Sequence, residues 1–141
     1  MAGCSTARPG IAARNLPHSI GREHHIVLKT REYIEANYSE DISIRDLASI
    51  GNMSTFHFIR VFAREMGVPP HAYLNQVRLR RARELLASGW SIAATACETG
   101  FVDQSHFSRR FKRIFGITPG QYSNFIQYGR SLRAHNAATM S

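Results

Sequence analysis

Two stretches of the chain carry polar and cationic side chains at the same spacing. In the first, Thr55 is followed five positions later by Arg60, and in the second, Gln104 is followed five positions later by Arg109. The forked guanidinium of arginine matches the two acceptors on a guanine edge, and the amide of glutamine binds an adenine edge in the same two-point manner. The chemistry of both stretches therefore suits the recognition of nucleic-acid bases.

These stretches lie in the longer helices of an internal repeat. Residues 44–73 match residues 92–122 at an offset of 48 and then 49, because one residue is inserted after the second turn. The pattern predicts a short helix, a tight turn and a longer helix in each copy, over 44–50 and 55–66, and over 92–99 and 104–115. The expected N-caps are Ser43, Ser54, Ser91 and Asp103, and the expected left-handed turn residues are Asn52 and Gly100. Each copy is a helix-turn-helix, whose second helix can enter a major groove.

The remaining elements are helical as well. Hydrophobic periodicity predicts a first helix over 23–37, a long linker helix over 70–88 and a short last helix from Pro119 to about Ile126. No alternating stretch is long enough for a strand, so the expected fold is all-α, with two helix-turn-helix subdomains and about seven helices. The expected domain covers 23–127, between flexible tails over 1–22 and 128–141.

Helical spacing separates a buried face from a contact face on the longer helices. The four phenylalanines at Phe58, Phe62, Phe107 and Phe111 are spaced for the core. The outward residues, which we predict to read bases, are Thr55, Phe56, Ile59 and Arg60 in the first copy and Gln104, Ser105, Ser108 and Arg109 in the second. Phe56 and Ile59 suit thymine methyl groups, with packing against a neighbouring helix as the alternative. For Gln104 and Arg109 the alternative is an ordinary solvated helix surface.

The charge pattern favours a polyanionic partner. The chain has 18 basic and 10 acidic residues, a net charge of +8, with −3 over residues 23–53 and +6 over residues 54–113. Sixteen of the basic residues are arginine, which fits phosphate and guanine recognition but also a GC-rich genome. We expect phosphate contacts from Arg64, Lys112 and Arg113. The linker-helix residues expected to form a solvated face rather than bind phosphate are Arg78, Arg80, Arg81 and Arg83.

Residues 92–122 resemble the DNA-binding domain of the AraC/XylS family of bacterial transcription regulators. The shared features are a Gly-Phe turn at 100–101, the helix start Asp-Gln-Ser-His-Phe-Ser-Arg at 103–109, and the closing Gly-x-Thr-Pro-x-x-Tyr at 116–122. The linker segment 78–86 is also similar, and the resemblance covers about residues 25–125. The chain departs from the family at Thr95, where an aliphatic residue is usual, and at Asn52, where glycine is usual.

The resemblance implies seven helices and two recognition helices on one chain. It implies base contacts from Phe56, Ile59, Arg60, Gln104, Ser105 and Arg109. The expected function is sequence-specific binding of double-stranded DNA by a cytoplasmic, nucleoid-associated transcription regulator, with activation as the expected direction and RNA polymerase as a further candidate partner. One chain is expected to bind one asymmetric operator as a monomer. About 22 residues precede the domain, so a stand-alone regulator and the DNA-binding module of a longer, effector-responsive regulator both stay open.

Other functional classes lack support in the sequence. There is no glycine-rich phosphate loop, no Gly-x-Ser-x-Gly and no His-Glu-x-x-His, so we expect neither an enzyme nor a cofactor or metal. Cys4 and Cys97 cannot build a disulfide scaffold, and no segment is apolar enough for a membrane partner. A basic RNA-binding protein is the remaining alternative, although the phenylalanines have core spacing instead of forming an open stacking platform.

Overall fold

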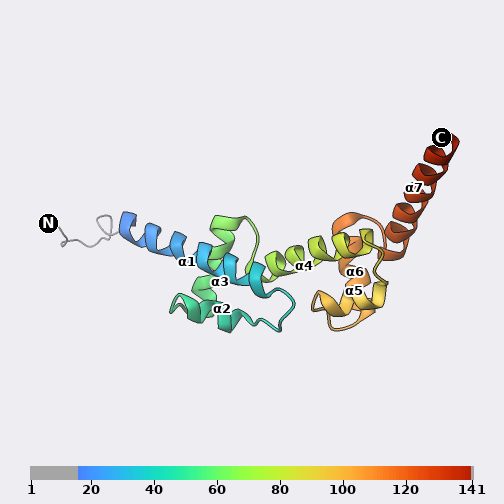
Figure 1. Cartoon of the computed structure of the whole chain (residues 1–141). Helices are drawn as coiled ribbons and strands as arrows, with labels where there is room; N and C mark the ends of the chain where they lie inside the picture. The colour runs from blue at the N-terminus through green and yellow to red at the C-terminus, as the bar shows by residue number, and fades with distance from the viewer. Residues whose placement is uncertain (1–15, 141) are drawn as a thin grey trace, which may run out of the picture. The chain divides into compact units, whose positions relative to one another are not determined.

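Seven α-helices make up the part of the chain that the computed structural model describes, residues 16–140 (Figure 1). Side chains are described for residues 20–137. No strand occurs in the described range, which confirms the all-α prediction. In chain order the helices are α1 Leu16–Asn37, α2 Ile44–Ile50, α3 Thr55–Met66, α4 Pro70–Ala87, α5 Ile92–Glu98, α6 Gln104–Phe115 and α7 Pro119–Met140.

The helices divide into two compact units, and α4 contributes to both. The first unit comprises the described part of Met1–Ala36 together with Ile42–Ala72, and thus holds α1 to α3 and the start of α4. The second comprises the rest of α4, α5 to α7 and the short segment Asn37–Asp41. Each unit contains one of the predicted helix-turn-helix motifs, α2–α3 in the first and α5–α6 in the second.

The first unit is built around the inner faces of α1, α2 and α3. Phe58 and Phe62 of α3 are fully buried, with ring centroids 5.7 Å apart. Ile34 of α1 and Leu47 of α2 are buried as well. The buried hydroxyl of Thr30 donates a hydrogen bond of 3.0 Å to a carbonyl one helical turn earlier, so this polar group is satisfied within α1. The core of this unit therefore holds α3 by one face and leaves its other face outward.

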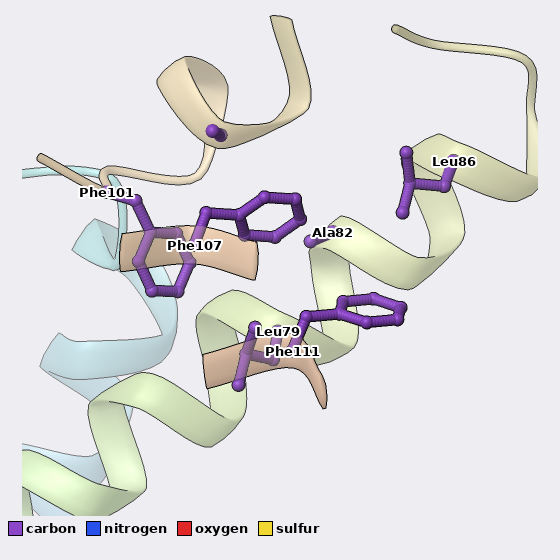
Figure 2. Packing of buried hydrophobic residues seen from close by; sticks show 7 residues of the cluster. Leu79, Ala82, Leu86, Phe101, Phe107 and Phe111 are labelled. Atoms are coloured by element: carbon purple, nitrogen blue, oxygen red, sulfur yellow. The ribbon is translucent and has the colours of Figure 1, made fainter. Parts of the chain in front are cut away.

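The second unit has a core of its own, in which aromatic side chains of α6 meet the aliphatic side of α4. Figure 2 shows the rings of Phe107 and Phe111 directed toward α4, where Leu79 and Ala82 lie. Both phenylalanines are fully buried, and their ring centroids are 5.7 Å apart. The predicted core role of the phenylalanines is confirmed. The buried cluster comprises Leu79, Ala82, Leu86, Ala96, Phe101, Phe107 and Phe111.

The C-terminal end of the predicted fold is wrong. The sequence predicts that the last helix ends near Ile126 and that a tail follows from residue 128, but α7 continues to Met140. Gly129 costs only ~1 kcal/mol relative to alanine inside a helix, and the alanines and arginines that follow it are good helix formers. The Arg130 guanidinium also donates a hydrogen bond to the carbonyl of Ala87 at the end of α4. A polar, aperiodic stretch can therefore continue a helix although its side chains over residues 130–137 are all exposed.

The N-terminal boundary also differs from the prediction. α1 begins at Leu16, so residues 16–22 of the predicted tail are helical. Pro17 stands in the first turn, where the missing amide hydrogen costs nothing because it would have no partner within the helix. The rest of the predicted tail, residues 1–15, lies outside the described residues.

Candidate nucleic-acid interface

Both candidate recognition helices begin at a side-chain cap. The Ser54 hydroxyl accepts a hydrogen bond of 3.2 Å from the backbone amide of His57 at the start of α3. The Asp103 carboxylate accepts one of 2.7 Å from the amide of His106 at the start of α6. Each cap satisfies an amide that has no partner within the helix and so fixes where the helix starts. The predicted starts of α3 and α6 are confirmed.

The turn before each helix requires a left-handed backbone. Asn52 has φ 58° and Gly100 has φ 87°, as the sequence predicts. A Cβ atom on Gly100 would also lie 2.9 Å from the carbonyl oxygen of Ser39. Glycine at this position is thus required both by the backbone angle and by the close approach of the segment Asn37–Asp41.

The four predicted base-reading residues of α3 are all exposed: Thr55, Phe56, Ile59 and Arg60. The exposed fraction of Phe56 is 72%, which excludes the alternative that it packs beneath another described helix of its unit. Ile59 is half as exposed, at 36%. The guanidinium carbon of Arg60 lies 5.9 Å from the centroid of the Phe56 ring, so an apolar ring and a cationic fork share one face. Such a face can bind a thymine methyl and a guanine edge side by side.

The second helix presents a more polar face. Gln104, Ser105 and Arg109 are exposed on α6, and Ser108 is half-buried. Within residues 20–137 no ion pair involves Arg109, so its guanidinium has no carboxylate to leave before it binds a base. The structure thus places all eight predicted residues on the outward faces of α3 and α6, with Ser108 the least accessible. Contact with bases stays a prediction.

The predicted phosphate-binding residues fall into two groups. Lys112 and Arg113 are exposed in the last turn of α6, and no ion pair among the described side chains engages them. Arg64 of α3 is different, because its Nη2 lies 2.7 Å from a carboxylate oxygen of Glu23 and 4.0 Å from one of Glu65. The ion pairs of Arg64 must therefore break before Arg64 can bind a phosphate, whereas Lys112 and Arg113 have no such pair to break among the described side chains.

Glu23 of α1 is a part of this site that the sequence does not reveal. Its carboxylate accepts a hydrogen bond from Arg64 and lies 3.2 Å from Nε2 of His57, both on α3. A second pair joins Nδ1 of His24 to Glu65 at 2.7 Å, also between α1 and α3. The Arg64 guanidinium holds the pKa of the Glu23 carboxyl below its usual value, against the opposing effect of burial. The partners are 34 and 41 positions apart, so no motif spacing links them.

The linker-helix arginines do not share one environment. Arg78 is half-buried; its Nε donates to the carbonyl of Tyr38 at 2.7 Å and its Nη2 to that of Glu40 at 2.8 Å. Burial lowers the pKa of its guanidinium. The prediction of a solvated face is therefore wrong for Arg78, which anchors the segment Asn37–Asp41 to α4. The three that are exposed, as predicted, are Arg80, Arg81 and Arg83.

Comparisons with known proteins agree with this geometry. The family model described as a helix-turn-helix domain matches residues 47–125, which include both candidate recognition helices. The chain is 35% identical over 75 residues to an uncharacterized HTH-type transcriptional regulator, YbfI of Bacillus subtilis, covering 53% of this chain and 27% of the relative. It is similar to the structure of a probable AraC family transcriptional regulator from Rhodopseudomonas palustris, with a TM-score of 0.66, 30% identity and coverage of 72% of this chain and 97% of the other.

A further structural neighbour was solved in complex with DNA. The DNA-binding domain of AdpA, a global transcriptional factor, in complex with a target DNA, matches with a TM-score of 0.66, covering 78% of this chain and 96% of the other. Its sequence identity of 24% supports a shared fold only. The chain spans about a quarter of the length of the curated relatives it matches.

Two other kinds of site are not found among the described residues. No group of three or more histidine, cysteine, aspartate or glutamate side chains is placed to share a metal ion there. In the same part of the chain, no helix combines the length and the apolar character needed to cross a membrane.

Proposed function

Because the chain belongs to the AraC-type helix-turn-helix family of DNA-binding transcription regulators, we propose that it inserts α3 and α6 into successive major grooves of one duplex site. The observation that carries this proposal is the presence of two capped recognition helices in a single chain, each with a buried and an outward face. A protein with one such unit must dimerise to reach two grooves. This chain holds both units, so it binds as a monomer.

The two outward faces differ, and the site therefore has a direction. At the first, second and fifth helical positions, α3 presents Thr55, Phe56 and Ile59 where α6 presents Gln104, Ser105 and Ser108. Among the four predicted base-reading residues of each helix, only Arg60 and Arg109 agree, and each binds a guanine edge in its own groove. Gln104 is matched to adenine and the apolar pair on α3 to thymine methyls. Two half-sites read by different side chains make an asymmetric operator.

The linker helix is compatible with this arrangement. α4 has 18 residues and is therefore about 27 Å long. Successive major grooves on one side of a straight duplex are about 34 Å apart. A modest bend of the DNA toward the protein brings the grooves closer, at a cost of a few kcal/mol that depends on the deformability of the intervening base steps. Sequence preference is therefore also expected between the two half-sites.

We expect Lys112 and Arg113 to supply phosphate contacts. Replacing either one with glutamine should make the plot of log affinity against log salt less steep by about 0.9, because each phosphate neutralised releases about that number of counterions. Affinity should fall by a similar factor on every sequence. The measurement is fluorescence anisotropy over a salt series. Arg133→Gln, at an exposed position on α7, removes the same charge and should leave the slope unchanged. An equally weakened salt dependence in Arg133→Gln would contradict these contacts.

Membership of this family supports a proposal for the wider role. We propose that the domain, built from α1 to α7, acts by binding alone, without a catalytic step or a cofactor. In this role it serves as an activator on the cytoplasmic nucleoid and contacts RNA polymerase. Reporter transcription is measured with and without the chain, on a promoter that carries the DNA site the chain prefers. An increase indicates activation and a decrease indicates repression.

The proposed mode of binding is tested by selection from a random duplex library, followed by sedimentation of the complex. The expected result is one non-palindromic site bound by one chain, with two blocks of preference about one helical turn apart. Competition with RNA of the same length should displace little protein. A symmetric site bound by two chains would overturn the monomer proposal, and preferred binding to RNA would overturn the function itself.

A further inference from the structure

The two recognition helices differ in the electrostatic environment of one repeated arginine. Arg64 of α3 and Arg113 of α6 are equivalent positions of the internal repeat, and both are exposed. Arg64 donates a 2.7 Å hydrogen bond to Glu23, while no ion pair of the described residues includes Arg113. The two copies of the repeat therefore share an arginine at this position, but the arginine of α3 is ion-paired and that of α6 is not, among the described residues.

The Glu23 carboxylate is well placed to hold this arginine. Its side chain is only 18% exposed, and it lies between two basic groups of α3, Arg64 and His57. A charged hydrogen bond with limited exposure is less screened than an open surface pair. The neighbouring pair of His24 and Glu65 joins the same two helices, so two side-chain pairs connect α1 with α3 at this place.

The position of Arg64 on α3 gives this ion pair a consequence for DNA binding. Arg64 lies one helical turn beyond Arg60 and therefore on the same side of the helix. The first residues of a recognition helix meet base edges, and a long cation one or two turns further along can reach the sugar-phosphate backbone. A carboxylate beside it has the opposite effect, because it neutralises the cation and repels phosphate.

We propose that Glu23 is a positioning residue that withholds Arg64 from DNA phosphates. This inference rests on the proposed function and adds a division of labour to it. The second unit supplies the phosphate contacts of the recognition helices through Lys112 and Arg113, while the first unit binds chiefly through its base-reading face. Because non-specific binding comes almost entirely from phosphate contacts, the Glu23–Arg64 pair reduces the affinity of the first unit for arbitrary duplex.

The test compares salt slopes on a random-sequence duplex, using the full chain. Glu23→Gln removes the carboxylate charge that accepts the 2.7 Å hydrogen bond and keeps the side-chain size, so Arg64 retains only its longer 4.0 Å ion pair with Glu65 and is freer to bind phosphate. The slope of log affinity against log salt should steepen by about 0.9, and affinity at ~0.1 M salt should rise about fivefold to tenfold. Glu32→Gln is the matched control, because it removes one negative charge from an exposed position of the same helix. Its slope should stay that of the wild type.

Two Arg64 variants make the result independent of any loss of packing in Glu23→Gln. Arg64→Gln alone should leave the random-duplex slope unchanged, because the wild-type residue contributes no contact there. The double variant Glu23→Gln/Arg64→Gln should return the steepened slope to the wild-type value. A merely structural role of Glu23 would alter urea unfolding without moving these slopes.

The outcomes separate this inference from the proposed function. A less steep salt dependence of affinity for Arg64→Gln, or equal salt slopes for Glu23→Gln and Glu32→Gln, overturns the withholding role while the function stands. A wild-type chain that does not distinguish its selected site from random duplex overturns the function instead. A steepened slope in Glu23→Gln that the double variant reverses supports the proposal.

Discussion

Replacing Phe111 with alanine should lower the free energy of unfolding by about 3–5 kcal/mol, the usual cost of removing a buried phenylalanine and leaving a cavity. Its ring is fully buried, with centroids 4.6 Å from Phe115 and 5.8 Å from Tyr122. α6 meets α4 and α7 through these rings. Since a small domain is stable by only about 5–15 kcal/mol, DNA binding should weaken through loss of fold. Urea unfolding followed by circular dichroism measures the change.

The matched control for this prediction is another phenylalanine of the same unit. Phe125 lies on α7 with 70% of its surface exposed. Phe125→Ala removes the same atoms but leaves no cavity, so the unfolding free energy should change by less than about 0.5 kcal/mol. Equal losses in the two variants would show that the ring cluster does not hold the second unit together.

The second large effect concerns sequence specificity. Arg60→Ala and Arg109→Ala should each cost about 1–3 kcal/mol of binding free energy on the selected site and relax preference at different base pairs. Among the described side chains no ion pair includes Arg60 or Arg109, so neither guanidinium has an ion pair to break before it binds a base. Arg60 lies over the Phe56 ring instead. Repeating the selection with each variant should show which half-site loses information.

Conservative replacements separate base reading from charge. Arg60→Lys and Arg109→Lys keep the positive charge but lose the planar fork that binds two acceptors at once. If the arginines read guanine, the lysine variants should also lose specificity while the salt slope stays near that of the wild type. If the alanine variants instead lose the same affinity on every duplex, the arginines bind phosphates and the assignment of a base-reading role is wrong.

Local features of the fold could be predicted from the sequence because their causes lie within a few residues. Ser54 and Asp103 cap the helices that follow them, and Asn52 and Gly100 adopt the left-handed turns that their side chains permit. Helical spacing alone identified the buried phenylalanines, and removing them left the exposed faces of α3 and α6. The internal repeat then indicated two equivalent units. Fold class and the candidate base-reading residues depend on these short-range rules.

Features that depend on contacts between distant segments were decided by the tertiary structure. Arg78 is half-buried because the segment Asn37–Asp41 returns to α4, which no local periodicity indicates. α7 continues past Gly129 although its sequence lacks a buried stripe, since helix formation there needs only favourable residues and few breakers. Glu23 reaches Arg64 across 41 positions. The sequence by itself therefore determined which side chains could face DNA, and the packing of α1 on α3 decided which of the cations are free to bind it.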